Sequence, residues 1–313
     1  MAIITQPDLL PEGSVAVTIG MFDGVHRGHV WLIDCLKRFA AERHLTPAVV
    51  TFREHPRNVL CGEGSMKLIM PLDRRLDLLA ATGIGHIILM DFTPSLSKLD
   101  SGGFMSLLNR SYGTAAVLMG YNHKFGHSRN ESFADYVSRG KALGVDVERA
   151  AEYSGEYAPV SSSIIRQLIE SGDVAAAAGK LGGFFSLRGT VVHGFARGRH
   201  IGFPTANIAT TDASALVPAD GVYAVEVVLH DGSTRGGMAN IGIRPTFDDG
   251  TAKSVEIHIF DFDADIYGKV LTVNFVARLR DEIAMKSVDE LKSRLAIDLE
   301  AAKSVLSRIV FPE

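Results

Sequence analysis

The sequence predicts two domains, a doubly wound α/β domain followed by an antiparallel β-barrel with a terminal helix. A chain of 313 residues exceeds the ~250 residues at which a single hydrophobic core stops growing efficiently. Up to residue 150, short apolar runs alternate with amphipathic stretches, which is typical of parallel strands joined by crossover helices. After Gly183 the segments become β-rich. We therefore place the boundary near residue 184 and expect domains over 1–184 and 185–313.

In the N-terminal half, apolar runs predict strands at 15–19, 48–52, 86–91, 115–119 and 145–148. Leucines at helical spacing predict helices over 29–43 and 72–81. Hydroxyl residues at 161–163 suit the N-cap of a further helix, which ends at Gly172. An Ala-rich helix then begins at Asp173 and ends at Gly182.

In the C-terminal half, the β-rich segments predict strands at 186–193, 222–229, 234–241, 254–260 and 270–277. Asp231-Gly232 lies between two of them and predicts a hairpin with a type I′ turn, in which both central residues have positive φ. The last helix has an apolar stripe over 291–306 and begins with a capping box of Ser287 and Glu290.

Composition restricts the classes of partner. Lys and Arg number 32 against 36 Asp and Glu, a net charge of -4, so no basic field favours nucleic acid. No run approaches the ~18 apolar residues of a membrane span and no targeting signal is visible, so we expect no membrane partner. The two cysteines, Cys35 and Cys61, indicate a reducing compartment and predict a cytoplasmic protein. The sequence leaves the oligomeric state open.

The first predicted strand leads into GMFDGVHRGH at 20–29, and a helix follows. Ligands of open α/β sheets bind beyond the carboxyl ends of strands, and a helix N-terminus offers free N–H groups to phosphate. His26 and His29 can donate to oxygens that gain charge when an α-phosphate is attacked. An isolated HxxH is more often a zinc pair or two solvated histidines, but the strand and turn before it favour a nucleotide site. Three glycines let the backbone approach phosphate closely: Gly20, Gly24 and Gly28.

This segment resembles the nucleotidyltransferase signature GxFDGxHxGH of the prokaryotic bifunctional riboflavin kinase/FAD synthetase family. The resemblance implies a nucleotidyltransferase-like, Rossmann-like domain that transfers AMP from ATP to FMN, giving FAD and pyrophosphate. It also implies catalytic roles for His26 and His29. The residues assigned to ATP in this motif are Gly20, Phe22, Asp23, Gly24 and Gly28.

Two motifs at later strand ends are similar to the flavin-binding motifs of the family. TFREHP at 51–56 is similar to TFxPHP with Glu54 in place of proline, which implies that His55 and Pro56 border the flavin. GYNHKFGHSR at 120–129 is similar to GxDFxFGxxR, with Asn122 and His123 in place of aspartate and phenylalanine. The resemblance assigns Asn122 to the flavin. Carboxyl ends of parallel strands share one edge of a sheet, so one cleft accommodates these motifs.

SSSIIR at 161–166 resembles the SSTxIR motif of the family. Ser162 and Arg166 are four residues apart on a helix and share a face, so a hydroxyl and a guanidinium can converge on one triphosphate. Ser162 is assigned to ATP binding and Arg166 to catalysis. In isolation the pair would more often be a capping serine and a surface arginine.

GRHIGFPTANI at 198–208 is similar to the GRxLGFPTANI signature of riboflavin kinases. The physical interpretation is a glycine-bearing loop that wraps ATP. Thr205 and Asn207 lie two residues apart on one side of an extended segment, and their oxygens are hard ligands suited to Mg²⁺. A polar turn is the ordinary interpretation of PTAN in isolation. The residues assigned to ATP here are Gly198, Gly202, Pro204 and Thr205.

SVEIHIF at 254–260 alternates apolar residues with a second face that carries Glu256. One face of a barrel strand is core, so Glu256 is expected at an outer cleft. By family resemblance Glu256 is the general base for the 5′-hydroxyl of riboflavin, and a solvated strand glutamate is the alternative. ARLRDE at 277–282 is a further family-like segment, and its Arg280 is assigned to the flavin.

The resemblance extends from residue 15 to about residue 300. It implies an enzyme that acts on riboflavin, FMN and ATP with Mg²⁺, and for which FMN and FAD are products rather than prosthetic groups. Neither GxxxxGK[ST] nor GxGxxG occurs, so a P-loop and a dinucleotide fingerprint are not predicted. Two alternatives stay open. One is a riboflavin kinase whose adenylyltransferase half is impaired at Asn122 and His123, and the other is a non-catalytic flavin or nucleotide sensor.

Overall fold

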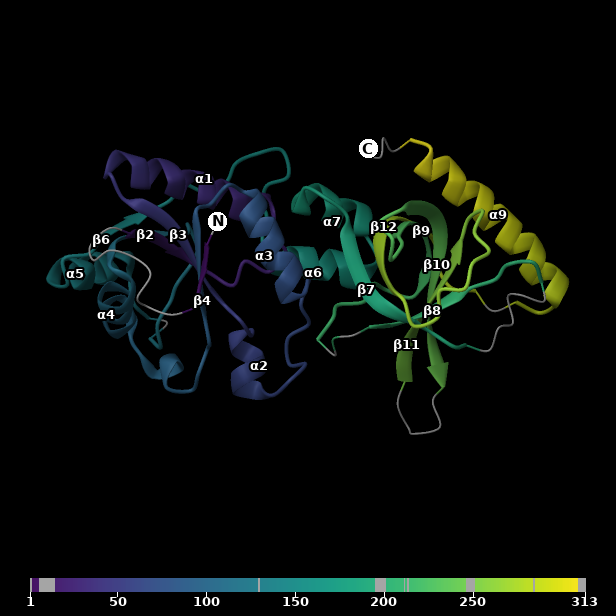
Figure 1. Ribbon diagram of the computed structural model, residues 1–313, viewed down its shortest axis with the longest axis horizontal. Coiled ribbons are helices and arrows are strands. Elements are labelled where there is room, and N and C mark those ends of the chain that lie inside the picture. The colour runs from purple at the N-terminus through teal and green to yellow at the C-terminus, as the bar shows by residue number, and fades with distance from the viewer. Residues whose placement is uncertain are drawn as a thin grey trace. The chain divides into compact units, whose positions relative to one another are not determined.

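The computed structural model describes residues 2–5, 15–128, 130–194, 201–210, 212, 214–245, 251–283 and 285–308. The chain divides into two compact units, Met1–Ser161 and Ser162–Glu313, called unit 1 and unit 2 below. Unit 1 contains a parallel sheet with helices, and unit 2 contains a closed antiparallel barrel followed by a helix (Figure 1). The predicted fold class is confirmed. Within the described part of the chain, no helix is long and apolar enough to cross a membrane.

The sheet of unit 1 has the strand order β1-β4-β3-β2-β5-β6, and its neighbouring strands pair in parallel. Apolar, β-branched runs explain why the central strands are buried on both faces. The strands are β1 (Ala2–Ile4), β2 (Val15–Ile19), β3 (Thr46–Phe52), β4 (His86–Met90), β5 (Thr114–Met119) and β6 (Asp146–Arg149).

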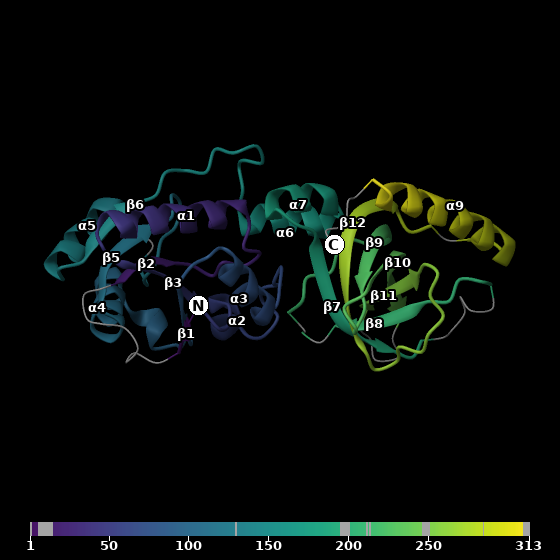
Figure 2. The ribbon, with the colours of Figure 1, turned by 45° about the horizontal axis from the view of Figure 1, so that its top comes forward.

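Helices cover both faces of this sheet (Figure 2). The helices α1 and α3 pack on one face, where Leu36 and Leu79 join the core around Val49 and Ile87. The helices α4 and α5 pack on the other face, with Leu108 and other apolar side chains. The helices are α1 (Arg27–Glu42), α2 (Pro56–Cys61), α3 (Leu72–Ala81), α4 (Ser101–Tyr112) and α5 (Phe133–Ala142).

Unit 2 begins with two short helices and continues into a barrel with the strand order β10-β11-β8-β7-β12-β9. Its strands pair in antiparallel fashion. The elements are α6 (Ser162–Ser171), α7 (Val174–Leu181), β7 (Phe185–Val192), β8 (Ala206–Thr210), β9 (Gly221–Val228), β10 (Thr234–Pro245), β11 (Thr251–Ile259), β12 (Val270–Arg280) and α9 (Val288–Leu306).

The terminal helix α9 covers a small apolar cluster on the outside of the barrel, where Ala302 and Leu306 meet Met238 and Phe260. The predicted capping box is only half formed. The Ser287 hydroxyl accepts from the Glu290 N–H at 3.1 Å, but the Glu290 carboxylate accepts from the Lys286 N–H at 2.8 Å. The Glu290 carboxylate therefore reaches back one residue beyond the N-cap, to Lys286 instead of Ser287.

The predicted hairpin between β9 and β10 is confirmed, but its predicted type I′ turn is wrong. Gly232 has a φ of 85°, whereas Asp231 keeps a negative φ. Gly232 N donates to the Leu229 carbonyl at 3.0 Å, and Leu229 N donates to the Ser233 carbonyl at 2.8 Å. This is a three-residue loop that ends in a left-handed glycine. The Asp231 carboxylate stabilises it by accepting from Ser233 N at 2.9 Å.

Candidate functional sites

The motifs of unit 1 follow strands at the point where the order of its sheet reverses. From β2 the chain adds β3 and β4 on one side, and β5 then pairs with the other side of β2. Residues 20–29 follow β2, residues 53–56 follow β3 and residues 120–128 follow β5. Because these strands are parallel, the three segments leave the sheet at one edge. Such a switch point is where open α/β sheets bind ligands.

His26 and His29 lie side by side at the start of α1. His26 is the N-cap, and its Nδ1 accepts from the backbone N–H of His29 at 3.2 Å. The two imidazole rings stack with their centroids 3.6 Å apart, and the Phe22 ring lies 5.0 Å from the His29 ring. The structure thus brings the two predicted catalytic histidines together at a helix N-terminus, where the helix dipole favours phosphate.

Both imidazoles are held neutral. Burial lowers the pKa of His26 to about 4. Burial lowers the pKa of His29 well below its usual range, and the cationic forms of His26 and His123 and the charge of Arg75 lower it further. Nδ1 of His29 is buried and has no hydrogen-bond partner among the described residues. A buried polar nitrogen in this condition calls for an explanation, and its contact with a phosphate oxygen of ATP stays a prediction.

Acidification is expected to destabilise unit 1. The His26 pKa is 6.5 in the unfolded chain and about 4 in the folded chain, so the unfolded state binds more protons and the free energy of unfolding decreases as pH falls from 6.5 to 4. By pH 5 the loss from His26 is about 2 kcal/mol. Urea unfolding measures it, followed by the fluorescence of Trp31, the single tryptophan of the chain. Unfolding curves that coincide at about pH 7.5 and pH 5 would contradict this expectation.

His26→Asn is the matched variant for this measurement. Asparagine keeps an acceptor at the N-cap of α1 but does not titrate. The variant is expected to lose about 2 kcal/mol less than the parent between the two pH values.

The turn before His26 is strained and tightly packed. Phe22 and Val25 are buried with φ values of 52° and 36°, and such conformations cost on the order of 1–3 kcal/mol each and cluster at functional sites. Gly24 has a φ of 90°, which glycine adopts without strain. A Cβ at Gly20 would lie 3.0 Å from the Phe22 ring, and one at Gly28 would lie 3.3 Å from the His26 ring. These two glycines make room for rings, and their approach to phosphate stays a prediction.

Asp23 has a structural role that the sequence did not reveal. Its side chain is buried, and its carboxylate accepts from the backbone N–H groups of Ile69 at 3.0 Å and Met70 at 3.4 Å. These bonds fasten the turn to the segment that precedes α3. The contacts of Asp23 and Phe22 with ATP stay predictions.

The predicted flavin residues of unit 1 lie at the ends of β3 and β5. His55 is the N-cap of α2, and its Nδ1 accepts from Arg57 N at 3.1 Å, with Pro56 at the first helical position. Asn122 is exposed in the segment that follows β5. Flavin contact by His55, Pro56 and Asn122 stays a prediction.

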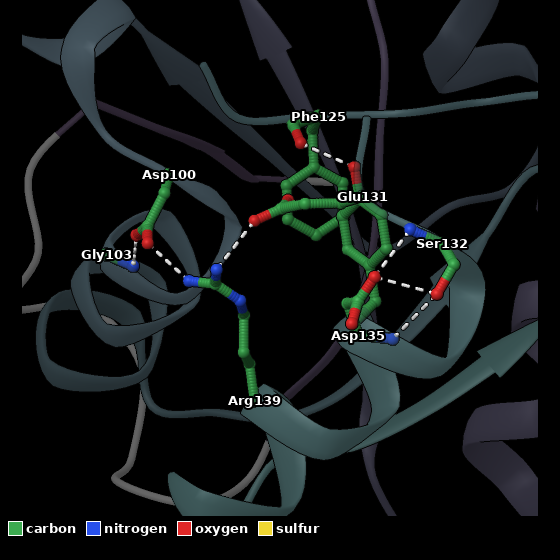
Figure 3. A network of polar contacts seen from close by, with 8 residues as sticks. Asp100, Gly103, Phe125, Glu131, Ser132, Asp135 and Arg139 are labelled. Atoms are coloured by element: carbon green, nitrogen blue, oxygen red, sulfur yellow. Dashed lines mark hydrogen bonds and ion pairs between the residues drawn. The ribbon is translucent and has the colours of Figure 1, made fainter. Parts of the chain in front are cut away.

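Polar contacts join the segment after β5 to α5, and join α5 to the start of α4 (Figure 3). The Tyr136 hydroxyl on α5 donates to the Phe125 carbonyl at 2.7 Å. Arg139 on α5 pairs with Glu131 at 3.0 Å and with Asp100, which is the N-cap of α4. The predicted flavin segment is therefore fixed to α5, which in turn pairs with the start of α4.

Ser162 and Arg166 lie on α6, four residues apart as the motif requires. This helix belongs to unit 2. The convergence of the Ser162 hydroxyl and the Arg166 guanidinium on a triphosphate stays a prediction.

In unit 2, strand pairing brings three predicted kinase residues together. Asn207 on β8 pairs in register with Glu256 on β11. The Thr205 hydroxyl donates to the Glu256 carboxylate at 3.2 Å. Asn207 is buried, and a Cβ at Gly194 would lie 2.0 Å from its side-chain nitrogen, so only glycine fits there. A hydroxyl, an amide and a carboxylate thus lie close together, and their binding of Mg²⁺ stays a prediction.

The predicted alternation along β11 is confirmed. Val255 and Ile257 are buried, whereas Glu256 is half-buried on the opposite face. His258 follows on the Glu256 face, and its Nδ1 lies 2.8 Å from the Pro204 carbonyl oxygen. Because a carbonyl only accepts, this nitrogen carries the proton. Glu256 and His258 therefore both reach the Pro204–Thr205 dipeptide, a role of His258 that the sequence analysis missed.

The structure gives less information on the glycines predicted to bind ATP in unit 2. Gly202 has a φ of 86°, which suits glycine in a turn. Gly198 lies outside the described residues. Contact of Gly198, Gly202 and Pro204 with ATP stays a prediction.

Arg280, predicted to contact the flavin, has a clear structural partner. Its Nε and Nη2 donate to the Asp298 carboxylate at 2.9 and 2.7 Å, and its Nη1 donates to the Asp281 carbonyl at 2.8 Å. Asp298 is buried on α9. This ion pair fastens β12 to the terminal helix, and flavin contact by Arg280 stays a prediction.

Two enzyme families match the two halves of this chain and show that it is a transferase. The model of the FAD synthetase family matches residues 11–164, and that of the riboflavin kinase family matches residues 181–306. A bifunctional riboflavin kinase/FMN adenylyltransferase from Haemophilus influenzae is 34% identical over 291 residues, covering 92% of this chain and 93% of its own. The relative of the same name from Bacillus subtilis is 33% identical over 98% of each chain. The chain belongs to the bifunctional riboflavin kinase/FMN adenylyltransferase family, which confirms the resemblance seen in its motifs.

A solved structure has the same overall fold. The crystal structure of a macrolide-efflux protein from Streptococcus pneumoniae is 32% identical, with a TM-score of 0.83 over 96% of this chain and 98% of its own. This likeness spans both units.

Proposed function

We propose that the barrel of this chain phosphorylates riboflavin to FMN with Thr205, Asn207 and Glu256, and that unit 1 transfers AMP from ATP to FMN with His26 and His29. The observation that carries the first assignment is the single cluster formed by Thr205, Asn207 and Glu256. The FAD synthetase and riboflavin kinase family models match the N-terminal and C-terminal parts of the chain, which supports the assignment of one reaction to each part.

In the kinase reaction, Glu256 takes the proton from the 5′-hydroxyl of riboflavin. The hydroxyl oxygen forms a bond to the γ-phosphorus of ATP, and the bond between that phosphorus and the β,γ-bridging oxygen breaks, leaving ADP. The hydrogen bond from Thr205 to Glu256 orients the carboxylate for this transfer. Because phosphoryl transfer needs little covalent help, positioning and charge neutralisation supply most of the rate.

The same cluster fits Mg²⁺. The hydroxyl of Thr205 and the amide oxygen of Asn207 are hard ligands beside a carboxylate, a donor set that Mg²⁺ accepts. When bound there with ATP, Mg²⁺ would neutralise the negative charge of the phosphate oxygens.

In the adenylyl transfer, the phosphate of FMN is already an anion and needs no base. One of its oxygens forms a bond to the α-phosphorus of ATP, and the bond from that phosphorus to pyrophosphate breaks. Nδ1 of His26 accepts a hydrogen bond, so the proton of this neutral ring lies on Nε2. That N–H donates to a phosphate oxygen as it gains charge, with His29 beside it.

One incubation tests the proposed function against both alternatives. The purified chain is mixed with riboflavin, ATP and Mg²⁺, and the flavins are resolved by chromatography. We expect FMN to appear first and FAD to follow. FMN without FAD would show a kinase with an impaired adenylyltransferase half, and unchanged riboflavin would show a sensor.

The boundary near residue 184 is also a proposal, and two C-terminal fragments test it. A fragment of residues 181–313 contains every assigned kinase residue, so it is expected to fold and to phosphorylate riboflavin. A fragment of residues 162–313 adds α6 and α7, and α7 packs against β7 and β12. Ile169 on α6 and Val174 on α7 are buried, and burial of each side chain contributes ~1.5–3 kcal/mol to stability. The unfolding temperature of the 162–313 fragment is therefore expected to be about 5 °C or more above that of the 181–313 fragment. A folded 181–313 fragment without kinase activity would show that the boundary is wrong.

A further inference from the structure

Arg75 on α3 is a buried cation at the carboxyl edge of the unit 1 sheet. Arg75 is only 2% exposed to solvent. Burial lowers its pKa to about 10, so the guanidinium stays charged at neutral pH. A buried charge strongly destabilises a fold unless it is hydrogen-bonded. Nε of Arg75 has no hydrogen-bond partner among the described residues, so the partners of Nη1 and Nη2 indicate why the guanidinium is there.

The guanidinium joins the ends of two strands. Nη1 donates to the Met21 carbonyl at 3.0 Å, directly before the turn that leads to His26. Nη2 donates to the Phe52 carbonyl at 2.5 Å and to the Arg53 carbonyl at 3.4 Å, directly before His55. A planar guanidinium with several donors is suited to such bridging, whereas an ammonium acts as a point charge.

Two further contacts hold the ends of β2 and β3 and the segment before α3 together. The Thr51 hydroxyl on β3 donates to the Met21 carbonyl at 3.2 Å. Asp23 accepts from the N–H of Ile69, six residues before Arg75, and its negative charge opposes the lowering of the Arg75 pKa by burial. The turn after β2 is therefore tied to the segment 69–75 twice, once through Asp23 and once through Arg75.

We propose that Arg75 is a positioning residue for adenylyl transfer, which holds the histidine segment 20–29 against the predicted flavin segment 53–56. The first segment carries the histidines proposed for ATP, and the second carries the residues proposed for FMN. One guanidinium that joins the two fixes the distance between the attacking FMN phosphate and the α-phosphate of ATP. This role rests on the proposed function of unit 1. Arg75 acts through the backbone and is not a catalytic residue.

The test measures kcat and KM for the conversion of FMN to FAD in Arg75→Lys and Arg75→Met. Lysine keeps the charge and methionine keeps much of the length, but neither bridges three carbonyls. We expect kcat to fall ~10–100-fold, the effect of a displacement of about 1 Å, while each KM changes less than ~3-fold because both substrates still bind.

Three controls separate positioning from simple loss of stability. Riboflavin phosphorylation by the same preparation is expected to stay unchanged, because unit 2 is untouched. Arg74→Met removes the exposed neighbour of Arg75 on α3 and is expected to keep full FAD synthesis. Urea unfolding followed by Trp31 fluorescence shows whether unit 1 is folded at the assay temperature.

Each outcome decides the proposal. A lower kcat in folded Arg75→Lys with little change in KM supports it. Folded Arg75→Lys and Arg75→Met variants that keep the parent kcat would overturn the positioning role and leave the function of unit 1 intact. A parent chain that makes FMN but no FAD would instead overturn the proposed function of unit 1 and the role of Arg75 with it.

Discussion

Glu256→Gln is expected to lower riboflavin phosphorylation by about 10²-fold or more, the usual size of a general-base effect. Glutamine has the shape of glutamate and still accepts the hydrogen bond from Thr205, so the β8–β11 pairing is kept. Only the ability to take the proton from the 5′-hydroxyl is lost. Conversion of supplied FMN to FAD is expected to continue at the parent rate, because Glu256 is not among the residues assigned to that reaction.

The measurement follows both reactions in one preparation. Glu226→Gln is the matched control, because Glu226 is also part-buried on a barrel strand and hydrogen-bonds to Asn274, away from the assigned kinase residues. It is expected to leave phosphorylation unchanged. Kinase activity of Glu256→Gln within a few-fold of the parent would reject Glu256 as the base.

His29→Ala is expected to have the opposite effect, sparing FMN formation and lowering FAD formation by about 10²-fold. One donor to a charged transition state contributes this much when it is held in place beforehand. His29 is the third residue of α1, and alanine is the best helix former, so the helix is expected to persist. The His26 imidazole loses its stacking partner but keeps its N-cap bond to the backbone.

An exposed histidine at the end of α1 provides the control. His44 has a φ of 55°, so asparagine, which tolerates this conformation, is the appropriate replacement. His44→Asn is expected to keep full FAD synthesis. If His29→Ala also keeps FAD synthesis while bound zinc falls, the two histidines are a metal pair.

The sequence predicted the elements that have a long or alternating apolar pattern. The five predicted strands of unit 1 appear as β2 to β6, and 72–81 is α3 without change. β1 was missed because three residues give too short a pattern. β8 was not predicted as a strand, although Thr205 and Asn207 were placed on one side of an extended segment. The helix α4 was missed although Phe104 and Leu108 are four apart, since two glycines at its start weaken the helical signal.

The motifs predicted which side chains of the barrel come together, but they did not predict the long-range contacts of Arg75 and His258. Thr205, Asn207 and Glu256 were expected at one site, and the structure brings them together. Arg75 and His258 act on carbonyl groups far away in the sequence, and such contacts leave no motif. A weaker signal exists for Arg75, because it lies within the apolar stripe of Leu72, Leu76 and Leu79. A charged residue at a core position is worth a search for its partners.

The open sheet of unit 1 has two edge strands at which aggregation can begin, whereas the closed barrel formed by the described strands of unit 2 has none. A strand at a sheet edge presents unpaired N–H and C=O groups to which another chain can add. One edge of the sheet is β1, only three residues long. The other is β6, where Asp146 and Glu148 are exposed and pair with Arg43, the C-cap of α1. A short strand and a charged strand both discourage edge-to-edge aggregation, so the unit can keep its switch point open to substrates without joining neighbouring copies into a continuous sheet.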